Sequence, residues 1–331
     1  MAKIVFFSSS HRALPALELL RKNLEIVGVI SQPDKLSGRK MKLTPTTIST
    51  YAQEQNLPLL KPEKLDADAI AWIAKKKPDV LLLSYYGLWI PPELFNLTPA
   101  GILVTHPSLL PKWRCGSPVQ ATILSGQEQT GVTLMKMDEQ FDHGPTVAVE
   151  PDTVLDNDGQ ETLYTRLFTK GAELAIKVLP DYLNGRIKPI PQDHSKATFA
   201  RHITREDGFI TPQLLNAAMQ GETSEGSPWK IRWMLDSNKR PFNLQPSTFA
   251  LERFIRAMSP WPGAWSTVIV NSDSGKVTKR LKLLRSHRTR SDSEGGKLKL
   301  DEVQLEGKNP VSWKQFRQWQ PQPLSELFGV E

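Results

Sequence analysis

Short apolar runs alternate with helical patterns through the first half of the chain. Runs at residues 3–7, 26–30 and 79–84 favour strands, and helical patterns at 8–20 and 66–76 come between them. The run at 79–84 holds four consecutive apolar residues, as expected of a strand that is covered on both faces. This alternation predicts βαβ units, and therefore an α/β fold with a mostly parallel sheet.

The pattern changes toward the middle of the chain. Residues 130–138 and 146–149 predict two strands that can form a hairpin, and residues 158–183 predict a long helix. Asn184-Gly185 is a typical helix stop, because glycine readily adopts the left-handed conformation that ends many helices. We therefore expect a first domain over residues 1–185.

The rest of the chain has a weaker pattern. Residues 186–203 contain prolines and no clear period, which predicts a linker, and residues 204–331 remain for a second, smaller domain. A helix is expected at 251–258, followed by a rigid aromatic turn at 259–265. Short alternating runs favour strands at 266–270, 281–284, 298–300 and 302–305. Strands of this kind predict a small β-barrel, a fold that often binds nucleic acid.

The clearest candidate for chemistry is His106. The apolar run at 102–104 predicts a buried strand, and Pro107 and Pro111 cannot continue it because proline lacks a backbone N–H. His106 should therefore lie at the carboxyl end of a strand, where open α/β sheets bind ligands. Histidine also exchanges protons near neutral pH. A histidine at a strand end can equally be a structural polar residue, and this stretch alone leaves both interpretations open.

An aromatic segment follows the strand at 79–84. Residues 85–92 contain two tyrosines, a glycine and a tryptophan. Aromatic rings and a glycine at the end of a strand suit a flat heteroaromatic ligand. A hydrophobic cluster that caps the sheet explains the same residues equally well.

Basic residues are concentrated in two places. The chain has 42 Lys and Arg against 35 Asp and Glu, a net charge of +7. Four of the eight residues at 35–42 are basic, and Thr44-Pro45 beside them predicts a helix start that leads to residue 55. Seven more basic residues lie between Lys276 and Arg290, before a flexible tip at 291–296. Such clusters suit contacts with phosphates, whereas composition alone favours a solvated loop at 35–42.

Other features narrow the class of protein. Cys115 is the only cysteine, so no disulfide can form within the chain, and we expect a reducing cytoplasmic location. The sequence has no apolar run of about 18 residues and no secretory signal pattern, so we expect no membrane contact. No spacing of metal ligands is present, and no metal is expected.

Several motifs, in order, resemble the methionyl-tRNA formyltransferase family. In the first half they are residues 33–34, 38–45, 86–88, 106–114, 130–133, 137–138 and 142–144. In the second half they are residues 256–264 and 305–308. The sequence His-Pro-Ser-Leu-Leu-Pro at 106–111 is shared by folate-dependent formyltransferases as a group. The basic loop and the basic second half narrow the resemblance to the tRNA enzymes.

The resemblance implies a Rossmann-like formyltransferase domain followed by an OB-like β-barrel domain that binds tRNA. It implies transfer of the formyl group of 10-formyltetrahydrofolate to the α-amino group of methionine on initiator tRNA, by a cytoplasmic monomer. His106 and Asp142 match the catalytic positions. The positions implied for folate binding are Tyr86, Gly87, Leu88, Ser108, Leu109, Leu110 and Pro111. The positions expected to bind tRNA are Arg39, Lys40, Lys42, Lys279, Arg280 and Lys282.

The chain departs from the family at Val104, where the family has an asparagine. Formyl transfer passes through a tetrahedral oxyanion, and loss of one oxyanion donor costs about 3 kcal/mol. Two alternatives therefore stay open: a catalytically impaired relative that binds tRNA, and a formyltransferase that acts on a nucleotide-linked amino sugar. Smaller departures are the serines at 8–10, where Gly-Thr is common, and Cys115, where glycine is usual.

Overall fold

The computed structural model describes residues 1–37, 41–222, 229–272, 275–289 and 296–330. The chain divides into two compact units. The first contains residues 1–115, 129–153 and 161–197, and the second contains 116–128, 154–160 and 198–331. Residues 186–197, within the range where the sequence predicts a linker, belong to the first unit.

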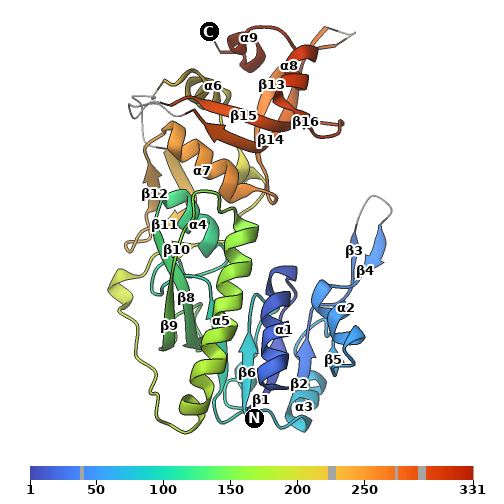
Figure 1. Cartoon of the computed structure of the whole chain (residues 1–331), viewed down its shortest axis with the longest axis vertical. Helices are drawn as coiled ribbons and strands as arrows, with labels where there is room; N and C mark the ends of the chain where they lie inside the picture. The colour runs from blue at the N-terminus through green and yellow to red at the C-terminus, as the bar shows by residue number, and fades with distance from the viewer. Residues whose placement is uncertain (38–40, 223–228, 273–274, 290–295, 331) are drawn as a thin grey trace. The chain divides into compact units, whose positions relative to one another are not determined.

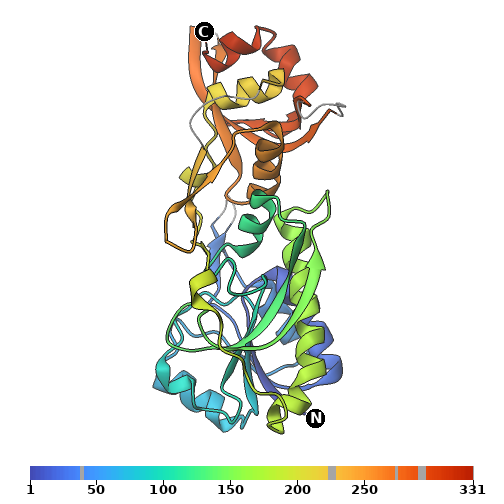
Figure 2. The same ribbon diagram turned by 90° about the vertical axis from the view of Figure 1, so that its left-hand side faces the viewer.

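A seven-stranded sheet forms the centre of the first unit. In order across the sheet its strands are β5 (Leu59–Leu60), β2 (Glu25–Ile30), β1 (Lys3–Phe7), β6 (Val80–Leu83), β7 (Ile102–His106), β8 (Gln129–Lys136) and β9 (Thr146–Thr153). The strands from β5 to β7 pair in parallel. The last two strands are antiparallel and form the expected hairpin (Figures 1 and 2). The strand order reverses at β1 and β6, the position at which such sheets bind ligands.

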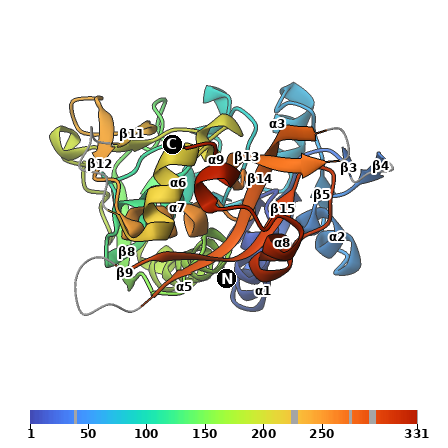
Figure 3. The same cartoon turned by 90° about the horizontal axis from the view of Figure 1, so that it is seen from above.

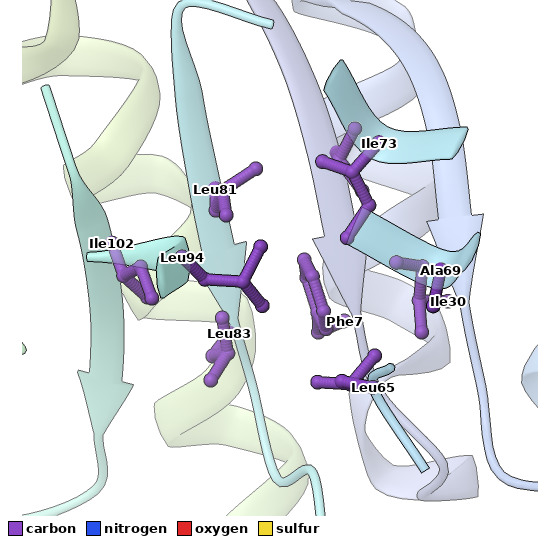
Figure 4. Packing of buried hydrophobic residues seen from close by; sticks show 10 residues of the cluster. Phe7, Ile30, Leu65, Ala69, Ile73, Leu81, Leu83, Leu94 and Ile102 are labelled. Atoms are coloured by element: carbon purple, nitrogen blue, oxygen red, sulfur yellow. The ribbon is translucent and has the colours of Figure 1, made fainter. Parts of the chain in front are cut away.

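Helices cover both faces of this sheet. They are α1 (Leu14–Asn23), α2 (Thr47–Glu54), α3 (Ala67–Lys75) and α5 (Gln160–Leu183), with 3₁₀ turns at His11–Ala13, Pro92–Leu94 and His194–Lys196. On one face, side chains of β1, β6 and β7 pack with Leu65, Ala69, Ile73 and Leu94 (Figure 4). On the other face, α5 approaches β7 so closely that a Cβ at Gly171 would lie 3.1 Å from Thr105. Burial on both faces explains the unbroken apolar run in β6.

The basic loop differs from its prediction. Residues on either side of it pair as a hairpin of β3 (Lys35–Ser37) and β4 (Lys42–Thr44). Thr44 therefore ends a strand and is not the N-cap of α2. The N-cap is Thr46, whose hydroxyl accepts a hydrogen bond from the Ser49 N–H. The local sequence favoured a helix start at Thr44-Pro45, but the cross-strand pairing with Lys35 holds Thr44 in an extended conformation.

The described residues of the second unit form two antiparallel sheets. One is formed by β10 (Phe199–Ala200), β11 (Trp229–Leu235) and β12 (Pro241–Leu244). The other is formed by β13 (Ala264–Ser272), β14 (Gly275–Arg288) and β15 (Leu298–Leu305), which are labelled in Figure 3, and by β16 (Val311–Ser312), which is labelled in Figure 1. The helices are α4 (Pro118–Ser125), α6 (Pro212–Gln220), α7 (Thr248–Met258), α8 (Trp313–Trp319) and α9 (Leu324–Phe328), with a 3₁₀ turn at Glu206–Gly208.

The fold class is confirmed: a mostly parallel α/β sheet is followed by a smaller antiparallel β region. Where the sequence predicts an OB-like barrel, the described strands pair as one sheet in the order β13-β14-β15-β16. Its strands are longer than predicted. Charged residues interrupt the apolar alternation along β14, so the prediction covered only the apolar part of that strand. The tip at 291–295 lies outside the described residues. No helix in the described part of the chain is long and apolar enough to cross a membrane.

Leu81 tests the importance of the apolar cluster. It is 0% exposed at the centre of β6. We expect Leu81→Ala to lower the free energy of unfolding by about 2–5 kcal/mol, because the substitution removes buried methyl groups and leaves a cavity. Urea unfolding followed by circular dichroism measures this. Leu43→Ala is the control, since Leu43 is 59% exposed and its loss should change stability by less than about 0.5 kcal/mol. Equal effects of the two substitutions would contradict the packing described.

Candidate active site

Strand β7 carries His106 to the carboxyl edge of the parallel sheet. Side chains alternate along a strand, so Ile102, Val104 and His106 lie on the same face. Ile102 belongs to the apolar cluster and Val104 packs against it. His106 is the last residue of the strand and is buried. The prediction that a strand ends at this histidine is confirmed.

The structure brings His106 and Asp142 together. The Nδ1 atom of His106 lies 3.5 Å from Oδ1 of Asp142, and its Nε2 atom lies 3.0 Å from the carbonyl oxygen of Trp113. The other carboxylate oxygen of Asp142 accepts a hydrogen bond of 2.8 Å from the Cys115 N–H. Both ring nitrogens therefore face acceptors.

Asp142 lies in the β8–β9 loop (residues 137–145), which has a constrained backbone. Asp142 has a φ of +48°, a left-handed conformation that Asp tolerates better than most side chains. A Cβ at Gly144 would lie 1.9 Å from the carbonyl oxygen of Lys136, so only glycine fits there. The loop therefore has little freedom to place the carboxylate of Asp142 elsewhere.

The segment Ser108–Pro111 follows β7 and is held by Thr133 of β8. The Thr133 hydroxyl donates to the Ser108 carbonyl at 2.7 Å and accepts from the Leu110 N–H at 3.0 Å. The Ser108 hydroxyl donates to the Lys112 carbonyl. Leu109 and Leu110 are half-buried. This segment is an ordered rim beside His106, and Thr133 is a supporting residue.

The aromatic segment after β6 divides between the two faces of the sheet. The ring of Tyr86 packs edge-on against Phe7 with the centroids 5.4 Å apart, and its hydroxyl is buried without a partner among the described residues. Burial raises the pKa of this hydroxyl well above its ordinary value. Tyr85 contacts Tyr164 on the opposite face, and Gly87 is exposed while Leu88 is half-buried. The side chain of Tyr86 thus belongs to a packed cluster.

Some of the basic positions that are expected to bind tRNA lie on one face of a strand. Arg280 and Lys282 are exposed on the same face of β14, and Arg280 lies over the ring of Trp265 at 4.3 Å from its centroid. Lys279 is on the opposite face, because side chains alternate along the strand. Lys42 is exposed on β4. Arg39 and Lys40 lie outside the described residues.

Comparison with known proteins identifies the family. The profile of the Formyl transferase family matches residues 2–179, more than half of the chain. A methionyl-tRNA formyltransferase of Chloroflexus aurantiacus is 35% identical over 266 residues, which cover 80% of this chain and 76% of that protein. One from Listeria monocytogenes is 34% identical over 250 residues, which cover 75% of this chain and 80% of that protein. The chain belongs to the methionyl-tRNA formyltransferase family.

A solved structure of a family member supports the shared fold. The methionyl-tRNA formyltransferase from Clostridium thermocellum matches this chain with a TM-score of 0.52 and 16% sequence identity. The match covers 92% of this chain and 99% of that one. The likeness therefore includes the antiparallel region as well as the parallel sheet.

In the present chain, Val104 is an apolar residue of β7 close to His106. It pairs with Leu83 of β6 and Met135 of β8, and it packs against the apolar cluster. Its place on the face of His106, two residues earlier, puts it about 7 Å along the strand from the histidine. The side chain offers no hydrogen-bond donor at this point.

Sequence reasoning missed a set of residues around the β8–β9 loop. Arg114 is buried and donates to the Oε1 atom of Gln192 and to the Nδ1 atom of His194. The ring of His194 stacks on that of His143 with the centroids 3.9 Å apart, and His143 contacts Asp138. No local signal indicated Gln192 and His194, because they come from a segment with no periodic pattern. Arg114, Asp138 and His143 belong to motifs that carry the family resemblance, but the motifs alone assign them no role. Among the described residues, no group of three His, Cys, Asp or Glu side chains is arranged to hold a metal ion.

His194 gives this part of the structure a dependence on pH. Desolvation, followed by the charges of His143 and Arg114, lowers the pKa of His194. The folded protein therefore binds this proton less readily than the unfolded chain. The contribution to stability is complete above the ordinary pKa of about 6.5 and is lost as the pH falls below it.

We expect the melting temperature of the wild type to fall more between about pH 7.5 and pH 5.5 than that of His194→Gln. Glutamine can still accept the hydrogen bond of Arg114 but does not titrate. Differential scanning fluorimetry across this range measures the difference. Parallel curves for the two proteins would show that the His194 proton does not contribute.

Proposed function

We propose that this chain transfers the formyl group of 10-formyltetrahydrofolate to the α-amino group of methionine on initiator tRNA. The observation that carries the proposal is the pairing of His106 with Asp142 at the carboxyl edge of the parallel sheet. Membership of the methionyl-tRNA formyltransferase family supports the choice of both substrates.

The reaction requires a proton to move and a negative charge to be stabilised. The α-amino nitrogen attacks the formyl carbon, and an electron pair moves onto the formyl oxygen. The new C–N bond is kept when the bond between the formyl carbon and N10 of the folate breaks. The proton that the amine loses is matched by the proton that N10 gains.

We assign the proton transfer and the charge stabilisation to His106. The carboxylate of Asp142 faces the ring from the Nδ1 side, at 3.5 Å. On the other side, the substrate would replace the Trp113 carbonyl as the partner of Nε2. When the ring carries the proton taken from the amine, its positive charge lies beside the oxygen on which negative charge develops, where an electrostatic contact lowers the barrier.

Folate binding is assigned to the two segments that follow β6 and β7. These parallel strands are neighbours, so Tyr86–Leu88 and Ser108–Pro111 leave the sheet at the same edge. The half-buried ring of Tyr86 packs against Phe7 of β1, and the exposed Gly87 leaves its backbone open to a ligand. We propose that the folate contacts Gly87 and Leu88 and the Ser108–Pro111 segment, with Tyr86 fixing their position.

The basic positions are assigned to tRNA. On the hairpin β3–β4 these are Arg39, Lys40 and Lys42, and on β14 they are Arg280 and Lys282. Lys279 points to the other face of β14, so we expect a smaller contribution from it. We further propose a monomer in the cytoplasm, where translation takes place, in agreement with a chain that has a single cysteine.

A formylation assay tests the reaction. We expect the wild type to transfer labelled formyl from 10-formyltetrahydrofolate to methionyl-tRNA, and His106→Ala to lose at least about a hundredfold in kcat because it removes the proton-transferring group. Circular dichroism should show that this variant is folded. An inactive wild type, or substantial activity of His106→Ala, would reject the assignment.

In the same assay, the Val104→Asn variant tests whether the site lacks an oxyanion donor. If another group supplies the donor, the substitution leaves kcat unchanged. If the donor is missing, it raises kcat, by up to about a hundredfold to a thousandfold.

Binding of tRNA tests the basic positions. We expect Lys42→Ala and Lys282→Ala each to weaken tRNA binding and to lower the slope of log affinity against log salt by about 1, because each removes a phosphate contact. Fluorescence anisotropy at several salt concentrations measures both quantities. Lys22→Ala, at an exposed position on α1, is the matched control. A loss no greater than that of the control would show that these lysines are only solvated.

A further inference from the structure

The segment of residues 190–194 holds the β8–β9 loop along its length. Ile190 and Thr146 exchange two backbone hydrogen bonds of 2.8 Å at the carboxyl end of the loop. His194 stacks on His143 within the loop. Gln192 lies between these two contacts. The sequence predicted a linker here, but the segment acts as a support for the loop that carries Asp142.

Gln192 uses its whole amide group in this support. Its Nε2 atom donates to the carbonyl oxygens of Asp142, at 2.9 Å, and of Gly144, at 2.7 Å. Its Oε1 atom accepts from Nε and Nη2 of Arg114, at 3.2 and 2.7 Å. Gln192 is 8% exposed and Arg114 is 4% exposed. The two N–H hydrogens and the carbonyl oxygen of this side chain are thus all engaged.

These contacts act on the residue that faces His106. Asp142 has a left-handed backbone, which costs free energy unless its surroundings hold it in place. Gln192 holds the carbonyl oxygen of Asp142, and the carboxylate of the same residue then lies at the Cys115 N–H and at His106. Arg114 fixes the amide of Gln192 in the orientation that donates to the two carbonyls, because a guanidinium can only donate.

We propose that Gln192 and Arg114 are positioning residues, which set the carboxylate of Asp142 against His106 through the backbone of the β8–β9 loop. This proposal rests on the proposed function, in which His106 and Asp142 act as a pair. Neither positioning residue needs to touch a substrate. Their effect is therefore on the rate of the chemical step and not on substrate binding.

Gln192→Glu is the sharpest test. A carboxylate of the same shape can still accept from Arg114, but it cannot donate to the two carbonyls, and it places oxygen against oxygen. We expect kcat to fall about tenfold to a hundredfold, as for a displacement of roughly 1 Å in a reacting site. KM for methionyl-tRNA and for the folate should stay within about twofold. Steady-state formylation kinetics provide both values.

Gln160→Glu is the matched control. Gln160 is 1% exposed and also donates through Nε2 to two backbone carbonyls, those of Ala257 and Trp261, but these lie in the second unit. We expect it to lower stability in the same way as Gln192→Glu and to leave kcat unchanged. An equal loss of kcat in the two variants would show that general destabilisation explains the result, and would overturn the proposal.

A double-mutant cycle separates positioning from a direct role. If Gln192 acts through Asp142, then adding Gln192→Glu to Asp142→Asn should lower kcat no further. Additive losses would contradict the proposal. If Gln192→Glu does not fold, Arg114→Lys takes its place, since a single ammonium retains the charge but cannot form both contacts to Gln192.

A measurement independent of activity distinguishes this proposal from the proposed function. The Cys115 N–H donates to the Asp142 carboxylate, so its hydrogen exchange reports where that carboxylate lies. We expect faster exchange in Gln192→Glu than in the wild type and in Gln160→Glu. Unchanged exchange overturns the positioning role. An inactive wild type with the expected exchange would reject the proposed function and retain the support by Gln192.

Discussion

The pairing of β6 with β1 on one side and β7 on the other is the constraint on which the site depends. All three strands run in the same direction, so their carboxyl ends open at one edge of the sheet. The strands are covered on both faces, and this burial fixes their register. The segments that follow β6 and β7 therefore leave the sheet side by side. His106, as the last residue of β7, is placed by the same register.

The rest of the site is built from segments that pack against this edge. Thr133 of β8 holds the Ser108–Pro111 segment, and the β8–β9 loop brings Asp142 to His106. The loop is in turn held by Gln192 and by the stacking of His194 on His143. His106 is thus placed by its strand, whereas Asp142 is placed by hydrogen bonds from distant parts of the chain. The position of Asp142 is more sensitive to substitution, because it depends on a few buried polar groups.

Val104 is a departure from the family at a position close to His106. The family relationship rests on most of the chain, and the fold that places His106 and Asp142 is intact. The side chain at position 104 packs as a hydrophobic residue against the apolar cluster. The ring of His106 lies between the Asp142 carboxylate and the Trp113 carbonyl, two residues along the strand from position 104.

The sequence by itself determined the strands β1, β2, β6 and β7 of the parallel sheet, the long helix α5 and the place of His106 at a strand end. Each of these follows from local periods and from the backbone limits of proline and glycine. It did not determine that Thr44 pairs in a hairpin, that Tyr86 packs on Phe7, or that residues 190–194 support the β8–β9 loop. Only the tertiary structure decided these features. They depend on contacts between segments far apart in the chain, and such contacts leave no period in the local sequence.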